Sequence, residues 1–218
     1  MAYSFPLTRA DFFAGLTIET CTFDLPEVVE ISRTAAGEVL TADLGPRLWR
    51  GRITLPYLTH EEAEAVKAKL HLVRGGGASL LVYPPQKPHP AKDPGGAIIA
   101  GTSPTLAAIA ANNREIQITG LPAGYVLSPG DFLSFTYGSN PTRRALHQVV
   151  TGAVASAGGS TPAFEVVPAI RPGAATGAAV VLNKPFCKAV VVPGTVNAGI
   201  AAGLYTTGIS FSWQQTLR

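Results

Sequence analysis

Apolar and polar residues alternate at every second position in several parts of the chain, which predicts short β-strands with one buried face. The clearest segment is 209–214, with the sequence Ile-Ser-Phe-Ser-Trp-Gln. The other segments with this alternation, or with short apolar runs, are 49–55, 79–83, 115–119, 132–137, 164–166, 180–182 and 189–192. Turns with Gly and Pro separate these segments, and this arrangement is typical of a sandwich or barrel.

One segment, residues 59–73, has the period of an amphipathic helix instead. Thr59 and Glu62 have the spacing of a capping box at a helix start. After them, apolar residues recur at helical spacing at Ala63, Val66, Leu70 and Val73. The glycines at 75–77 favour the end of the helix. The pattern predicts one helix that packs one face on a sheet.

Prolines divide the chain into two parts. Residues 83–94 contain five of them, and because proline lacks an amide donor this stretch cannot lie inside a sheet. A second break occurs at Lys184-Pro185. We therefore expect a mainly β protein in which a β-sandwich-like domain with one α-helix, residues 1–93 plus 184–218, is split by an inserted small β-barrel or sandwich domain, residues 95–183.

Charge is scarce in this chain of 218 residues, of which 14% are charged, against about 25% in an ordinary globular domain. A surface with few charges is easy to desolvate, which favours subunit interfaces. Drift toward Ala and Gly in a GC-rich genome explains the same composition, and both readings stay open here. The net charge of +3 is mild. Arginines cluster at 47, 50 and 52 and at 143 and 144, without the interleaved aromatics of a nucleic-acid module, so we interpret them as solvated positions.

Three further features restrict the class of protein. Cys21 and Cys187 are the two cysteines, which is too few for a disulfide scaffold in a chain of this length. Residues 1–6 lack a basic region followed by an apolar stretch, so we expect no secretory signal. Apolar runs fall short of the roughly 18 residues that a transmembrane helix needs.

A search for catalytic spacing leaves chance pairings and turn residues. Cys187 and His147 could form a thiol–imidazole pair, but neither belongs to a nucleophile motif. Asp131 follows Pro129-Gly130, where an aspartate accepts hydrogen bonds within a turn. The other histidines lack metal-ligand spacing, and they are His60, His71 and His89. We therefore predict no enzyme, no catalytic residue, no metal site and no cofactor.

Two other groups of residues have simple structural explanations. Gly75-Gly76-Gly77 is followed by Ala78 and Ser79, without the lysine of a phosphate-binding loop, so it is better explained as a helix stop. Five aromatics could form a sugar-stacking platform, but Trp49 and Trp213 occupy apolar phases of alternating strands and are expected in the core. The remaining three are Tyr83, Tyr137 and Tyr205.

The order of several short motifs resembles that of a known family. The first part contains Phe5-Pro6-Leu7, a strand with Trp49, the helix at 59–73 and an apolar strand at 80–84. The middle part contains the segments 118–122, 127–132 and 166–171, and the closing strand is 208–217. This layout resembles the distal tail proteins and related tail-tip minor tail proteins of siphophages, the bacteriophages with long non-contractile tails.

The resemblance implies a structural protein of the virion tail, assembled in the bacterial host cytoplasm. Such a protein forms a homohexameric ring that joins the tail tube to the hub and baseplate. Its partners would be further copies of itself, the tail tube protein, the hub or tail-fibre protein, and the tape measure protein and DNA that pass through the lumen without sequence recognition. No membrane insertion is implied. The alternative is a carbohydrate- or host-surface-binding tail module carried by the inserted domain, with a host glycan as ligand.

Overall fold

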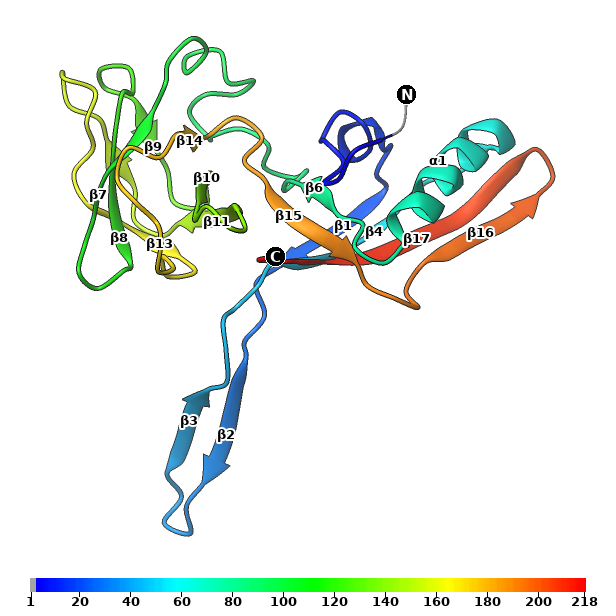
Figure 1. The fold of residues 1–218 in the computed structure, drawn as a ribbon, viewed down its shortest axis with the longest axis horizontal. Helices are drawn as coiled ribbons and strands as arrows, with labels where there is room; N and C mark the ends of the chain where they lie inside the picture. The colour runs from blue at the N-terminus through cyan, green and yellow to red at the C-terminus, as the bar shows by residue number, and fades with distance from the viewer. Residues whose placement is uncertain (1–2) are drawn as a thin grey trace.

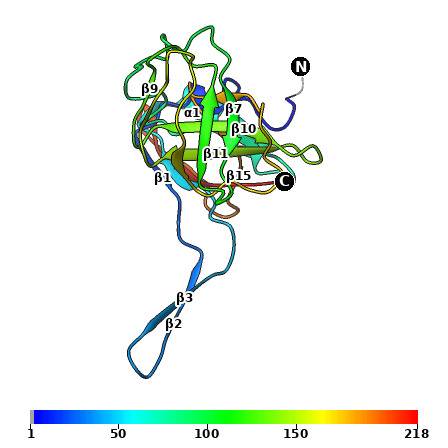
Figure 2. The same ribbon diagram turned by 90° about the vertical axis from the view of Figure 1, so that its left-hand side faces the viewer.

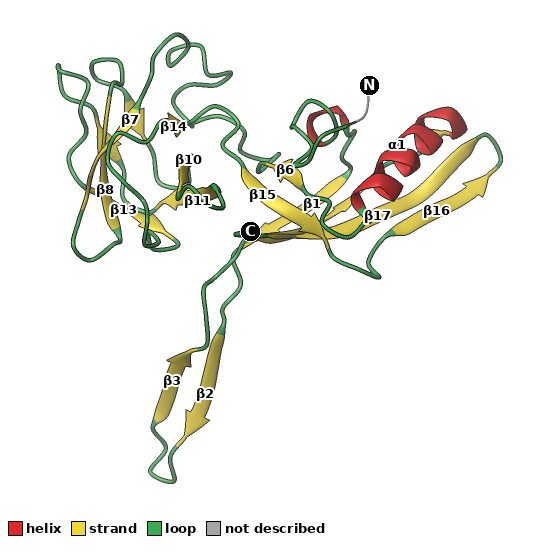
Figure 3. Ribbon diagram, in the orientation of Figure 1, coloured by secondary structure: helices red, strands yellow, loops and turns green. Residues whose placement is uncertain are grey.

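The computed structural model describes residues 3–218, and it is mainly β with one α-helix (Figures 1 and 3). Met1 and Ala2 lie outside the described residues. They belong to the expected domain segment 1–93 and to residues 1–6, in which no secretory signal is expected. The described chain contains a large antiparallel sheet, an inserted barrel and a projecting hairpin. The expected mainly β fold with one helix and an inserted barrel is therefore confirmed.

The main sheet is built around one long strand, β17 (Tyr205–Gln215). Along one side β17 pairs with β4 (Arg50–Thr54) and β5 (Leu58–Thr59), and along the other with β15 (Cys187–Val191) and β16 (Asn197–Ala202). Outside these lie β1 (Thr20–Asp24), which pairs with β4, and β6 (Leu80–Val82), which pairs with β15. All these pairings are antiparallel.

The alternation in residues 209–214 explains why β17 is central. Ile209, Phe211 and Trp213 have no exposed surface, whereas Gln214 is exposed. The Trp213 ring lies against Gly51 on the neighbouring strand, where a Cβ atom would come within 2.7 Å of it. The glycine at position 51 therefore makes room for the indole in the middle of the sheet.

The second layer consists of helix α1 (His60–Val73) and the N-terminal segment with the short 3-10 helix η1 (Phe13–Gly15). Thr59 caps α1 as expected, because its side chain accepts from the Glu62 amide and Glu62 accepts from the Thr59 amide. The predicted stripe faces the sheet: Ala63, Leu70 and Val73 are buried and Val66 packs against the same core. The sheet is thus covered on one face.

The inserted barrel is a nearly closed sheet of six strands, all within the expected 95–183 segment. In spatial order they are β14 (Val180–Val181), β10 (Phe132–Tyr137), β11 (Arg143–Val149), β13 (Phe164–Val167), β8 (Glu115–Thr119) and β7 (Thr105–Ile109). Hydrogen bonds from Leu106 N to Ala178 O (2.9 Å) and from Val180 N to Pro104 O (2.8 Å) bring the ends together. A separate pair, β9 (Val126–Leu127) with β12 (Ala153–Val154), lies beside it. The exact boundaries at 93–95 and 183–184 stay a prediction.

Strand β10 is buried on both faces because it forms the junction between barrel and main sheet. Leu133 and Phe135 point into the barrel core, while Phe132 belongs to the core of the main sheet. Ser134 accepts a hydrogen bond from the amide of Phe186, in the segment that leads into β15 (3.1 Å). The alternation of residues 132–137 predicts one solvent-exposed face, but the main sheet covers most of that face.

A third part of the chain projects from the main sheet and the barrel. Strands β2 (Val29–Arg33) and β3 (Val39–Asp43) form a two-stranded hairpin between β1 and β4. In both views the hairpin extends away from the sheet and the barrel (Figures 1 and 2). We call residues 26–46 the arm.

Candidate assembly surfaces

The arm is internally well defined, and at its base Asp43, Gly45 and Pro46 line a pocket together with residues of the barrel. Its turn is closed by hydrogen bonds from Thr34 N to Glu38 O (3.0 Å) and from Glu38 N to the Thr34 hydroxyl (3.1 Å). Its base is fixed by Arg47, whose guanidinium donates to the carbonyl of Leu25 (2.7 Å). Within residues 3–218, β2 and β3 pair only with each other.

The side chains of the arm are unusually apolar for an exposed position. Ile31, Val39, Leu40 and Leu44 are each more than half exposed. An isolated two-stranded hairpin is at best marginally stable in water, and exposed apolar side chains that gather together mark contact surfaces. The arm therefore has the properties of a segment that is completed by another molecule.

Two of the longer strands of the main sheet, β1 and β16, have a free edge, whereas the outer side of β6 is bridged by Leu7. β1 has β4 on one side and no strand among the described residues on the other, and β16 likewise has only β17. Exposed apolar side chains flank the β16 edge at Ile200, Leu204 and Tyr205. Free edges of this kind are templates for pairing with another chain.

One face of the main sheet is open and polar. Thr22, Arg52 and Ser212 lie side by side on β1, β4 and β17, and Arg50 and Gln214 follow them. Together they line a shallow groove of about 660 Å³. Arg52 donates to the Ser210 hydroxyl (3.2 Å). Arg50 and Arg52 are thus solvated strand positions, whereas Arg47 holds the base of the arm.

Charge is divided unevenly between the arm and the body. The arm carries Glu27, Glu30, Glu38 and Asp43 against Arg33, a net charge of −3. Since the whole chain has a net charge of +3, the rest carries +6. An acidic arm and a basic body are electrostatically complementary surfaces, which is a property of chains that associate with further copies of themselves.

The thiol–imidazole pair considered from the sequence is not formed. Cys187 lies in the core of the main sheet, where burial raises the pKa of its thiol. His147 lies inside the barrel, stacked on Phe135 with ring centroids 5.3 Å apart, and its Nδ1 donates to Pro168 O (2.7 Å). The other ring nitrogen, Nε2, is buried and has no partner among the described residues. Cys21, on β1, is separated from β15 by β4 and β17 and is a free thiol like Cys187.

Asp131 has the role of a structural turn residue. Its carboxylate is fully buried and accepts from the amides of Ser128 and Ala91, both at 2.8 Å. It also forms an ion pair with Lys87 (3.0 Å). Because Lys87 and Ala91 lie in the proline-rich segment, Asp131 ties that segment to the barrel.

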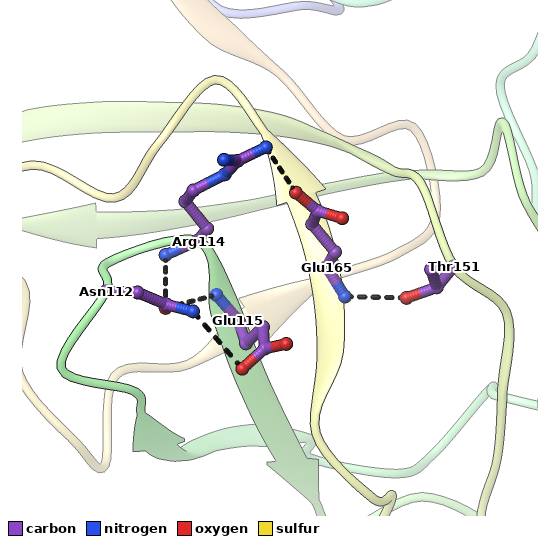
Figure 4. Close-up of polar contacts among 5 residues, drawn as sticks. All are labelled: Asn112, Arg114, Glu115, Thr151 and Glu165. Carbon is purple, nitrogen blue, oxygen red and sulfur yellow. Dashed lines mark hydrogen bonds and ion pairs between the residues drawn. The ribbon is translucent and has the colours of Figure 1, made fainter.

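A second polar network lies at one end of the barrel (Figure 4). The Asn112 side-chain oxygen accepts from the amides of Arg114 (2.9 Å) and Glu115 (3.3 Å). Arg114 forms an ion pair with Glu165 (2.6 Å), whose amide donates to the Thr151 hydroxyl (2.7 Å). No spacing along the chain predicts this network, because its members come from three separate segments. Its hydrogen bonds are those of an Asx turn and a strand cross-link, so it stabilises the barrel.

The aromatic residues and His60, which the sequence suggested as possible site residues, also lie at positions with a structural explanation. Trp49, Trp213, Tyr83 and Tyr137 are buried, and of the five aromatics Tyr205 alone is exposed. His60 contacts Thr206 and Gly203. Within residues 3–218, no three His, Cys, Asp or Glu side chains are grouped closely enough to hold a metal ion. No helix in that range is long and apolar enough to cross a membrane.

The candidate assembly surfaces are therefore the arm, the free edges of β1 and β16, and the open polar face. Comparison with known proteins gives no relative: no family model matches the chain, and no curated protein is significantly similar to it.

Proposed function

We propose that this protein is a structural subunit of a bacteriophage tail tip, a homohexameric distal tail ring that joins the tail tube to the hub and baseplate. The observation that carries the proposal is the arm, whose two strands pair with no other strand among residues 3–218 and expose apolar side chains. The order of motifs that resembles siphophage distal tail proteins supplies the class of assembly. We propose no catalytic role.

The two free sheet edges support a closed ring. β1 and β16 lie on opposite sides of the same sheet, so contact between them in neighbouring copies is heterologous, and such contacts give rings when they close. Successive antiparallel pairings give β1 the direction of β17, opposite to β16. The β16 edge of one copy and the β1 edge of the next would therefore pair as antiparallel strands.

In such a ring the open polar face would line the lumen and α1 would lie outside. Thr22, Ser212 and Gln214 give this face a hydrated surface, to which Arg50 and Arg52 add positive charge. DNA and the tape measure protein would pass it without sequence recognition. The flanking faces of the ring would contact the tail tube protein and the hub or tail-fibre protein. The virion tail, built in the bacterial cytoplasm, is the proposed location.

A carbohydrate- or host-surface-binding role of the barrel is a second candidate. The barrel is joined to the main sheet through residues of β10, β11 and β13, and β7 and β8 lie on its far side (Figure 1). A pocket on it favours this role, because it is lined by Arg143, Arg171 and Arg218, none of which forms an ion pair among residues 3–218.

The ring is tested by native mass spectrometry and negative-stain microscopy of the full chain, alone and mixed with purified tail tubes. The wild-type protein should give sixfold rings. Ile31→Asp should abolish the rings, because it places a charge in the apolar surface of the arm. It should leave the melting temperature within about 2 °C, since exposed positions contribute little to stability.

Ser32→Asp adds the same charge to the other face of the arm, where it lies across from Leu40, and it reports whether the face with Ile31 and Val39 makes the main contact. It should disturb the rings less than Ile31→Asp. A wild-type protein that stays monomeric and fails to join tail tubes would overturn the proposal.

A further inference from the structure

An open pocket of about 550 Å³ lies where the barrel meets the C-terminal end of the main sheet. Its lining is a mixture of positive charge and apolar surface: Tyr137, Pro141, Arg143, Arg171, Pro172, Leu217 and Arg218. The volume is within the range of small-molecule sites, roughly 300–1,000 Å³. It is therefore large enough for an organic molecule and not only for a single ion.

The arginines of this pocket have no carboxylate partners. The ion pairs among residues 3–218 join other side chains, and none includes Arg143, Arg171 or Arg218. Two of the guanidiniums are nevertheless held in place. Arg143 Nε donates to Leu217 O (3.1 Å), and Arg171 Nη2 donates to Arg47 O (3.0 Å). Each keeps further N–H groups for a ligand, and fixed guanidiniums suit the paired oxygens of a carboxylate or phosphate.

Tyr137 provides an independent observation at the same pocket. The residue is 5% exposed, and its hydroxyl is buried without a hydrogen-bond partner among the described residues. Buried polar groups are nearly always paired, so an unpaired one calls for an explanation. Burial raises the pKa of Tyr137, while the charges of Arg171 and Arg143 oppose the rise, so both guanidiniums lie within electrostatic range of the hydroxyl. The hydroxyl is thus a protonated donor beside the two guanidiniums.

We propose that this pocket binds a small organic ligand that carries a carboxylate or a phosphate group. Arg143 and Arg171 hold the oxyanion, and Pro141, Pro172 and Leu217 contact the carbon skeleton. The Tyr137 hydroxyl is covered in the free protein, and it donates its O–H to the oxyanion after a small shift of the pocket lining uncovers it. The inference gives a ligand class to the second candidate function, for which an acidic or phosphorylated sugar fits. It does not rest on ring formation, because the pocket is complete within one chain.

The test uses the full chain and four probes: glucuronate, glucose 6-phosphate, inorganic phosphate and neutral glucose. Saturation-transfer NMR and calorimetry should show binding of both acidic sugars and none of glucose, and inorganic phosphate should compete with them. A difference between glucuronate and glucose 6-phosphate shows which oxyanion the pocket prefers. Arg143→Gln and Arg171→Gln should each weaken binding about tenfold or more, as expected for loss of a hydrogen bond to a charged group.

Tyr137→Phe is the most discriminating variant. It removes a hydroxyl that has no hydrogen-bond partner among residues 3–218, so the melting temperature should not fall, while binding of both acidic sugars should weaken about tenfold. Arg74→Gln, which removes the same charge at an exposed position after α1, is the control and should bind as the wild type does.

Three results would overturn the site. They are absence of binding at millimolar concentration, equal binding of glucose and glucuronate, and binding that Tyr137→Phe leaves unchanged. A synthetic peptide of the acidic arm that binds where the sugars do not would also overturn it, and would assign the pocket to a neighbouring copy. Native mass spectra of the same samples report on the ring separately, so that failure of one proposal is distinguishable from failure of the other.

Discussion

The indole Nε1 of Trp49 donates a hydrogen bond to the carbonyl of Leu146, 2.8 Å away, and this contact joins the main sheet to the barrel. Trp49 precedes β4, and Leu146 lies on β11. The indole also packs on Phe132 of the barrel, with ring centroids 5.5 Å apart, and on Phe23 of β1 at 5.4 Å. One side chain therefore couples the two domains by a buried hydrogen bond and by aromatic packing.

Replacement of Trp49 tests the strength of this junction. Trp49→Phe keeps an aromatic ring but leaves the Leu146 carbonyl without its partner, so we expect a loss of about 1–3 kcal/mol in addition to the loss of packing. Trp213→Phe is the matched control, because it replaces a buried indole whose N–H has no hydrogen-bond partner within residues 3–218. Urea unfolding should show the larger loss for Trp49→Phe. Equal losses would mean that the hydrogen bond contributes nothing to stability.

Gly51 gives a second prediction. A Cβ atom at this position would lie 2.1 Å from the carbonyl oxygen of Thr22 and 2.7 Å from the Trp213 ring. Neither the backbone of β1 nor a fully buried indole can move without disturbing the sheet. We expect Gly51→Ala to cost about 3 kcal/mol or more, at the upper end of overpacking effects. Gly76→Ala, with open space around the added methyl group, should change the melting temperature little.

The helix and strands that could be predicted are those whose capping residues or apolar periodicity lie within their own sequence. The helix at 60–73 has a capping box and an apolar stripe within its own sequence, and β17 shows its buried face through Ile209, Phe211 and Trp213. Strands such as β7 and β16 contain many small residues, so that alternation is weak in them. The arm was not predicted as a projecting hairpin, because its sequence does not show that nothing in the chain covers it.

The arginine pocket could not be predicted for a different reason. Arg143 and Arg144 are adjacent in the sequence and were considered as one cluster, but successive strand residues point to opposite faces. Arg143 lines the pocket, while Arg144 lies over the Phe186 ring. Arg171 joins Arg143 only because the barrel folds β11 and the loop after β13 together. The spacing of Arg143 and Arg171 along the chain does not predict that they line the same pocket.

Asp131 should prove structural when it is replaced. Asp131→Ala leaves the amides of Ser128 and Ala91 without an acceptor and removes the partner of Lys87, so we expect a loss of about 1–3 kcal/mol. Lys87→Met breaks the ion pair but keeps both amide hydrogen bonds, and it should cost less. Urea unfolding measures both variants, and limited proteolysis of residues 84–94 should be faster in Asp131→Ala. A larger loss for Lys87→Met would contradict this account.

His147 makes the stability of the barrel dependent on pH. Burial is the main cause that lowers its pKa from 6.5 to about 4, and the charge of Arg171 acts in the same direction against the favourable hydrogen bond to Pro168. In the unfolded chain the imidazole binds its proton near pH 6.5. Between these values the unfolded state binds more protons than the folded state, so the free energy of unfolding falls as the pH falls.

The contribution of His147 is thus fully present above about pH 6.5 and is lost as the pH falls to about 4, a change of about 3 kcal/mol. His147→Phe keeps a ring against Phe135 but cannot take up a proton. We expect the variant to be less stable than the wild type at pH 7, because the Pro168 carbonyl loses its donor, and the difference should shrink or reverse toward pH 4.5. Urea unfolding at several pH values measures this difference, in which the carboxylates common to both proteins cancel. Parallel curves for the two proteins would show that His147 is not the titrating group.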